Sequence, residues 1–273
     1  MKIAISNIAW NVEEDKDILK LLKKYSILGV EIAPTKIWKN PTEESYQTIN
    51  KYRKYWGKNG ILVSSTQSML FGHPELSIFK NKDKRNATLI YLGKMIRISA
   101  QLGAEAIVFG SPKNRNRFNV SKAQALSIAS DFFFKLATIS KEQNVFFCIE
   151  PNPVEYGTNF INNTDEAIEL VKNVNHPNFK LHLDSGTMTV NGENVEKAIT
   201  DGFPYLRHFH ISEKILGPIG KGKTDHEKIA NILRTLNYKH WVSIEMRGME
   251  NSSNISVIDE VLKFTSAIYS ANS

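Results

Sequence analysis

Residues 179–184 read FKLHLD, an apolar strand pattern that stops on a potential metal ligand, and stops of this kind decide the fold. Three further stretches behave in the same way: Val145–Glu150, Tyr205–His210 and Trp241–Glu245. Successive stops lie roughly 25 to 35 residues apart, about the length of one strand–loop–helix–loop unit of an α/β barrel. The C-terminal ends of the strands in such a barrel face one shared pocket, so we expect the four terminal side chains to meet there.

Strand patterns alternate with amphipathic helical patterns along the whole chain. The predicted strands are residues 2–6, 29–33, 61–66, 106–110, 145–150, 179–184, 206–211 and 242–245. The predicted helices include residues 16–25, 84–102, 121–141, 165–173, 226–236 and 255–269, with Thr164 and Thr224 as helix caps. This alternation predicts one (β/α)8 TIM barrel with eight strands and eight helices, a single domain over residues 1–273. An open doubly wound sheet is the alternative, but no glycine-rich phosphate fingerprint follows the early strands.

The composition fits a globular protein of the cytoplasm. The chain has 273 residues and one cysteine, Cys148, which excludes an internal disulfide and fits a reducing compartment. It begins with a strand pattern rather than a signal peptide, and no apolar run is long enough to span a bilayer, so we expect no membrane partner. The net charge of +7 is spread over lysines on predicted helix faces. Such a distribution favours a solvated surface over a nucleic-acid partner.

The candidate metal ligands are Glu150, Asp184, His210 and Glu245. Carboxylates are rarely buried without a partner, and three in one pocket would repel one another unless a cation compensated their charge. Oxygen ligands with one imidazole suit one divalent cation, either Mn²⁺, Mg²⁺, Co²⁺ or Zn²⁺. Four protein ligands leave two positions of an octahedral ion for oxygens of a substrate. The residue types therefore favour a metal-dependent enzyme.

Strand parity places further side chains inside the barrel. If Asp184 and His210 point inward, His182 and His208 lie one layer beneath them, because alternate residues of a strand share a face. We expect both to be hydrogen-bonded interior histidines rather than ligands. By the same parity Cys148 becomes a small interior filler.

Four segments resemble the strand ends of a known family: Ile149-Glu150-Pro151, Leu183-Asp184-Ser185-Gly186, residues 208–213 (HFHISE) and Ser243-Ile244-Glu245. Their order and spacing are similar to those of the xylose-isomerase-like barrel superfamily. The nearest branch is the sugar-phosphate isomerase/epimerase group, which includes D-tagatose 3-epimerase and hydroxypyruvate isomerase. The resemblance extends over most of the chain and implies one divalent metal on the four strand-end residues. It also implies that Glu150 and Glu245 are the catalytic acid/base pair, on opposite faces of a small sugar or sugar phosphate.

Proton transfer next to a carbonyl needs such an arrangement. A cation on the carbonyl and hydroxyl oxygens stabilises the enediolate that forms when the proton leaves. One glutamate accepts the proton, and the same or the opposite one returns it. Return to the neighbouring carbon isomerises the sugar, whereas return from the opposite face epimerises it. We therefore expect a metal-dependent sugar (phosphate) isomerase or epimerase.

Three positions depart from the pattern of the ketose-epimerase branch. Tyr156 stands where those enzymes carry a glutamate, although Glu155 is adjacent. Thr187 replaces a histidine, and Leu216 replaces an arginine. These departures argue against a free-ketose 3-epimerase, while the paired glutamates keep related proton-transfer chemistry open.

Basic loops after two strands predict an anion site. Lys113 and Arg115 follow the fourth strand, and Lys221 lies in a glycine-rich loop after the seventh. They could clamp a phosphate or carboxylate, or the loops are solvated and their charge is incidental. Glu31, at the end of the second strand, is one further pocket candidate. The candidate substrate-binding residues are Trp10, Gln67, His73, Lys113, Arg115, Glu155, Lys221 and Arg247.

Three other functions remain open from the sequence. A dehydratase of the inosose or dehydroshikimate kind would use the same metal site. An apurinic-site endonuclease would use a zinc cluster on this barrel, but Ser111 and Thr187 stand where such a cluster needs histidines. A non-catalytic carbohydrate-binding protein would explain the missing helper residues. The sequence also leaves open whether the barrel forms a homo-oligomer.

Overall fold

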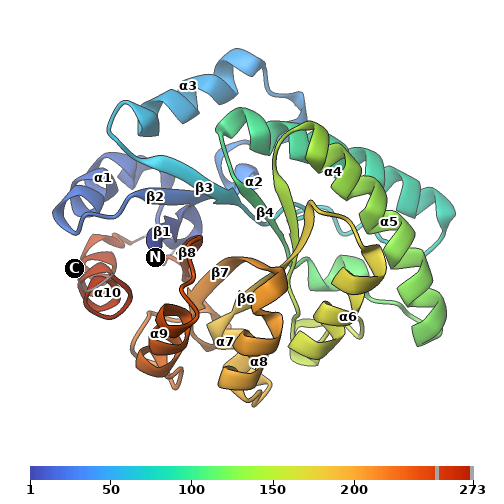
Figure 1. Ribbon diagram of the computed structural model, residues 1–273. Helices are drawn as coiled ribbons and strands as arrows, with labels where there is room; N and C mark the ends of the chain where they lie inside the picture. The colour runs from blue at the N-terminus through green and yellow to red at the C-terminus, as the bar shows by residue number, and fades with distance from the viewer. Residues whose placement is uncertain (250–251, 271–273) are drawn as a thin grey trace.

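The computed structural model describes residues 1–249 and 252–270. Eight parallel strands close into a barrel in chain order, and β1 pairs with both β2 and β8 (Figure 1). The strands are β1 (Lys2–Ser6), β2 (Gly29–Ile32), β3 (Leu62–Thr66), β4 (Ala106–Phe109), β5 (Phe146–Ile149), β6 (Phe179–Asp184), β7 (Leu206–Ser212) and β8 (Trp241–Glu245). The predicted (β/α)8 barrel is confirmed, and every strand boundary lies within one residue of the prediction.

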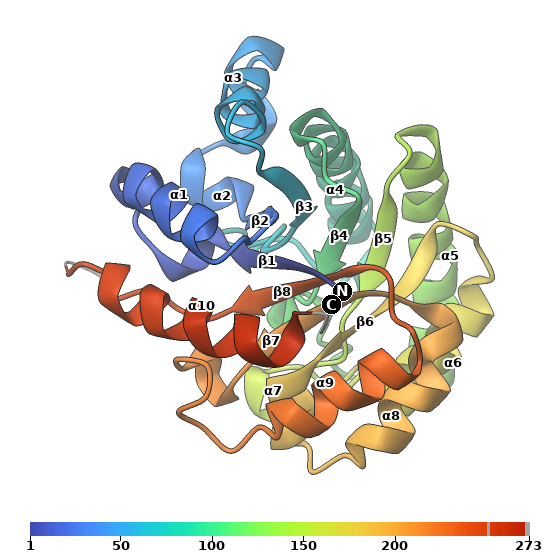
Figure 2. The ribbon, with the colours of Figure 1, turned by 60° about the vertical axis from the view of Figure 1, so that its left-hand side comes forward.

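Helices surround the barrel on its outer face (Figure 2). They are α1 (Asp15–Lys24), α2 (Pro34–Ile37), α3 (Tyr46–Gly57), α4 (Lys82–Leu102), α5 (Lys122–Glu142), α6 (Thr164–Val174), α7 (Ser185–Val190), α8 (Val195–Gly202), α9 (His226–Thr235) and α10 (Ile255–Tyr269). The last helix packs beside the first and closes the ring, with an ion pair of 2.7 Å between Lys24 and Asp259. Within the described ranges, no helix has the length and apolar character needed to cross a membrane.

Two of the predicted helix caps are wrong by one residue. Asn163 caps α6 by accepting the backbone N–H of Glu166, and Asp225 caps α9 by accepting that of Lys228. Thr164 is instead the first residue of α6. Asparagine and aspartate cap helices at least as well as threonine does, so Asn163 and Asp225 take the capping position next to the two threonines.

The strand register stacks polar side chains in layers at one end of the barrel. Strands β6 and β7 pair Asp184 with His210 and, one layer below, His182 with His208. Strand β8 brings Glu245 opposite Ser212. The four residues paired between β6 and β7 are buried, which confirms the interior placement predicted from strand parity. The barrel thus carries its polar interior at the C-terminal ends of β6 to β8.

Candidate metal centre

Asp184 ends β6 with its two carboxylate oxygens in different roles. Oδ1 accepts the backbone N–H of Thr187 at 2.6 Å and the hydroxyl of Ser212 at 2.7 Å. These bonds fix the side chain, because Asp184 is also the N-cap of α7. Oδ2 is buried and has no hydrogen-bond partner among the described residues. A buried carboxylate oxygen without a partner is costly, so Oδ2 is a ready ligand for a cation.

His210 lies between two carboxylates. Its Nε2 is 3.1 Å from the carboxylate of Glu31, and its Nδ1 is 3.2 Å from Oε2 of Glu245 and 3.8 Å from Oδ2 of Asp184. Glu31 also accepts hydrogen bonds from Ser65 and Gln67, so it holds the imidazole from below. A carboxylate on Nε2 leaves Nδ1 as the nitrogen that faces Asp184 and Glu245.

Glu150 completes the group from the end of β5. Ligand atoms of Glu150, Asp184, His210 and the deeper His182 all lie within 4.8 Å of one another. Glu245 joins through its contact with His210. The structure therefore brings Glu150, Asp184 and His210 together as predicted, adds His182 to them, and places Glu245 against His210 beside the group.

Charge crowding at this point shows in the pKa values. Burial, together with Glu245 and Asp184, raises the pKa of Glu150 to about 8. Burial and Glu245 raise the pKa of Asp184 to about 6. For His210, burial opposes protonation, but Glu31 and Glu245 outweigh it and hold the pKa well above its usual value. Without a cation, these groups retain protons, which limits the repulsion between their negative charges. A bound divalent ion would compensate those charges instead. The donor set of carboxylates and imidazole fits such an ion.

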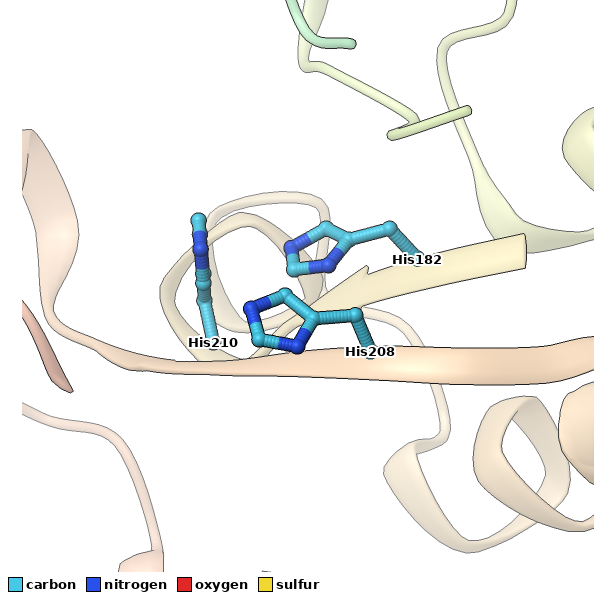
Figure 3. Close-up of side chains that lie close together, drawn as sticks. All are labelled: His182, His208 and His210. Atoms are coloured by element: carbon cyan, nitrogen blue, oxygen red, sulfur yellow. The ribbon is translucent and has the colours of Figure 1, made fainter. Parts of the chain in front are cut away.

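The two deeper histidines differ in their surroundings. The Nε2 of His208 lies 2.9 Å from Glu31 and 3.0 Å from the hydroxyl of Ser65, which confirms a hydrogen-bonded interior histidine. For His182 that prediction is wrong, because neither ring nitrogen has a hydrogen-bond partner in the described part of the chain. Figure 3 shows both rings reaching toward the ring of His210. Burial and the charge of His210 lower the pKa of His182 well below its usual value, so its ring is neutral.

A cavity of about 180 Å³ opens beside this group. At about 30 Å³ for each water molecule, it holds roughly six waters, the scale of one small sugar. Its lining includes the carboxylates of Glu150, Asp184 and Glu245, and the three positions that depart from the epimerase pattern, Tyr156, Thr187 and Leu216. Among the described residues, no lysine or arginine lines it.

Of the predicted substrate-binding residues, Gln67 lines the cavity and most others lie elsewhere. Trp10 is buried and donates its indole N–H to Asp15 at 2.7 Å. His73 contacts Tyr91 and Glu75 in a separate hollow on the outside of the barrel.

The basic loop residues do not reach the cavity either. Glu155 and Lys221 are exposed and pair with Lys214 and Glu260, while Lys113 and Arg247 are exposed. Arg115 is fully buried, and its guanidinium donates to Oδ1 of Asn152 at 2.8 Å. An Arg115 clamp on a substrate anion is therefore not the arrangement found. The buried cation lies near Glu150 and favours its charged form.

Sequence reasoning missed several residues that hold the site. Ser212 fixes Asp184, and Asn152 links Arg115 to the cavity wall. Glu213 accepts the backbone N–H groups of Gly220 and Thr224, so it anchors the loop after β7. Ser212 and Glu213 immediately follow His210 and its neighbour in strand β7, and a polar pair directly after a strand-end ligand was the available signal.

Replacing Gly110 by alanine should weaken metal retention. A Cβ at Gly110 would lie 2.3 Å from Oε2 of Glu150, so the carboxylate must move away from its present position. We expect a loss of metal affinity of about 10- to 100-fold, the range seen when groups that orient ligands are removed. Affinity is measured by competition with a chelator. Gly57→Ala is the matched control, since a Cβ there meets nothing within 4 Å; equal affinities of the two variants would contradict the placement of Glu150.

Two of the proteins to which this chain is similar are named as sugar epimerases. D-psicose 3-epimerase of Ruminiclostridium cellulolyticum is 24% identical over 269 residues, which cover 94% of this chain and 88% of that protein. A crystal structure of D-psicose 3-epimerase with D-tagatose from Clostridium cellulolyticum H10 superposes with a TM-score of 0.81 at 18% identity, covering 98% of this chain and 99% of that one. The structure of the IOLI protein with a bound zinc atom superposes with a TM-score of 0.75 at 18% identity, covering 99% and 98% of the two chains.

These structures share the fold of this chain over nearly its whole length. The sequence match to a family pattern extends over residues 19–268. The resemblance in the strand ends is thereby confirmed, and the chain belongs to the xylose isomerase-like TIM barrel family.

Proposed function

We propose that this protein is a divalent-metal-dependent sugar epimerase or isomerase that transfers a proton next to a carbonyl group. The observation that carries the proposal is the convergence of Asp184, His210 and Glu245 with Glu150 beside a cavity of sugar size. The relative named D-psicose 3-epimerase supports the same class of chemistry. Glu150, Asp184, His210 and Glu245 would hold the metal ion.

The two glutamates reach the cavity from well-separated strands. Glu150 follows β5 and Glu245 ends β8, while β6 and β7 lie between them and carry Asp184 and His210. A sugar in the cavity would thus have one carboxylate on either side. Removal of a proton by one and return by the other inverts a carbon centre, as an epimerase requires. When bound, the divalent ion would stabilise negative charge on the substrate's oxygens.

Burial prepares Glu150 for proton transfer. Without metal, burial and the neighbouring carboxylates raise its pKa to about 8, and a bound divalent ion would lower that pKa again by stabilising the carboxylate. A general acid or base works best when its pKa lies near the operating pH. Arg115, buried behind Asn152, tempers this shift by favouring the charged form of Glu150.

The cavity lining favours a neutral substrate over a phosphorylated one. Lys113 and Lys221 point to solvent and Arg115 is buried, so within the described ranges no cation faces the cavity. Leu216 and Tyr156 instead give part of the wall an apolar character. A neutral keto or aldo sugar is the substrate class that this lining supports.

Solvent deuterium exchange tests the proposal directly. The protein is loaded with Mn²⁺, Mg²⁺, Co²⁺ or Zn²⁺ and incubated in D₂O with neutral sugars and their phosphate esters. We expect deuterium at a carbon next to the carbonyl of at least one neutral sugar, detected by NMR and mass spectrometry. Loss of water from the product would identify a dehydratase instead. Tight sugar binding without exchange would leave a carbohydrate-binding protein.

A further inference from the structure

His182 is a buried polar side chain for which the four-ligand site gives no role. Its ring is 0% exposed, and neither Nδ1 nor Nε2 has a hydrogen-bond partner among the described residues. Leaving a buried polar group unpaired typically costs about 1–3 kcal/mol, so such groups are rare in folded proteins. The other buried histidines show what a structural role looks like. His226 uses both nitrogens, on Tyr269 and Glu213, and His208 bonds to Glu31.

The position of His182 points toward the metal centre. Its ring lies 4.1 Å from that of His210, centroid to centroid, in an edge-to-face arrangement (Figure 3). It sits one layer below Asp184 on the same face of β6. Neither ring nitrogen is engaged by a hydrogen bond from a neighbour, so a lone pair of the imidazole is available to a cation.

The distances suit ligation. Ligand atoms of Glu150, His182, Asp184 and His210 lie within 4.8 Å of one another. Ligands at about 2.1 Å on opposite sides of one ion lie about 4.2 Å apart. Four atoms within 4.8 Å of one another lie at most about 2.9 Å from a common centre, so shifts of less than about 1 Å would close these groups around a single ion. The ion would also satisfy Oδ2 of Asp184, which is otherwise without a partner.

We propose that His182 is a further ligand of the metal ion and reaches it from the layer beneath the strand ends. This rests on the metal site of the proposed function. The centre then combines two imidazoles with the carboxylates of Glu150 and Asp184, and Glu245 lies beside them through its contact with His210. Nitrogen donors suit Zn²⁺ and Co²⁺ better than Mg²⁺, so the site discriminates against Mg²⁺.

The test compares His182→Leu with the parent protein. Leucine keeps a similar volume and removes both unpaired nitrogens, so the metal-free variant should resist urea at least as well as the parent. Its affinity for Zn²⁺ and Co²⁺, measured by chelator competition, should fall by about 10- to 100-fold or more. Affinity for Mg²⁺ should change far less. The visible spectrum of bound Co²⁺ should also change, because it reports the nitrogen ligands themselves.

His226→Leu is the matched control for losing a buried histidine. It breaks the bonds to Tyr269 and Glu213, so it should lower stability while leaving Zn²⁺ affinity within about threefold of the parent. A His182→Leu protein that binds Zn²⁺ and Co²⁺ as the parent does, with an unchanged Co²⁺ spectrum, would overturn the proposal.

A crystal of the zinc-loaded parent tests the same point without a substitution. Anomalous scattering should place zinc about 2.0–2.1 Å from a ring nitrogen of His182. Zinc on the carboxylates and His210 alone, with His182 beyond bonding distance, overturns the role of His182 but leaves the proposed function standing. No zinc at this end of the barrel would remove both.

Discussion

Replacing Glu150 or Glu245 by glutamine should lower the rate of proton exchange by about 10²- to 10⁴-fold. Glutamine keeps the shape of the side chain but cannot accept a proton at neutral pH. Each glutamate serves one side of the cavity, so either replacement should block inversion of the carbon centre and should slow exchange of the epimer whose proton faces the replaced glutamate. The rates are measured by deuterium uptake into the sugar that the parent protein exchanges.

Loss of metal must be separated from loss of the base in this experiment. Both glutamates are expected ligands, so each variant is assayed at saturating metal and its bound metal is counted. Glu105→Gln is the matched control. Glu105 precedes β4, at the opposite end of the barrel, where it accepts the indole N–H of Trp241 and pairs with Arg207. It should lose stability but exchange normally. Full exchange in a metal-loaded Glu150→Gln or Glu245→Gln protein would refute the assigned roles.

The strands and the metal site could be predicted because both depend on short-range patterns. An apolar run that stops on a polar residue marks a strand and its end, and barrel geometry then brings the ends together. No knowledge of side-chain contacts was needed to expect Asp184 and His210 to meet. Strand parity likewise placed His182 and His208 beneath them.

Helix α3 escaped prediction because its apolar pattern is sparse. It buries only Ile49 and Trp56, which join the core where the helix packs against α4 and β3. Helix α7 starts directly after β6 and has six residues, too few for a periodic signal. Periodicity finds elements with a continuous apolar stripe, and these two have none.

Loop side chains were the least predictable part of the site. The loop after β4 begins with Ser111 in the left-handed region (φ 41°), and this bend accompanies the burial of Arg115. After β7, Ile215 and Leu216 also have positive φ (59° and 56°), an unusual conformation for a branched residue such as isoleucine. Asn152, which accepts a hydrogen bond from Arg115, lies 37 positions along the chain, and Glu213 stands at the start of the loop that it anchors. The positions of charged residues in the sequence therefore did not show which way their side chains point.

Without metal, the protein should lose stability as the pH rises from 6.5 to 8. Burial raises the pKa of Glu150 from 4.5 to about 8, so the folded state keeps a proton that the unfolded chain has already released. His210 acts in the same direction above pH 6.5, because its pKa is raised well above that value. Each proton held only by the folded state lowers stability by about 1.4 kcal/mol for every pH unit gained. Over this range we expect a loss of about 2 kcal/mol from Glu150 alone.

Other buried groups do not reverse this trend within the same range. Burial lowers the pKa values of His182 and His208. These two histidines therefore reduce the free energy of unfolding mainly as the pH falls below 6.5, where the histidines of the unfolded chain become charged. The carboxyl group of Asp184 has a pKa of about 6, so above pH 6.5 it is mostly deprotonated in the folded state and changes the pH dependence of stability little. The interval from pH 6.5 to 8 therefore isolates Glu150 and His210.

Urea unfolding in the presence of a chelator measures this effect at several pH values. Glu150→Gln should reduce the pH dependence by about one proton, since the amide does not titrate. Saturating Zn²⁺ should stabilise the parent most at pH 8, where the ligands give up their protons to the ion at least cost. An unfolding midpoint that stays constant from pH 6.5 to 8 in the chelated parent would contradict the crowding of charges on which the metal centre depends. A slope as steep in Glu150→Gln as in the parent would instead assign the whole titration to His210 and its contact with Glu245.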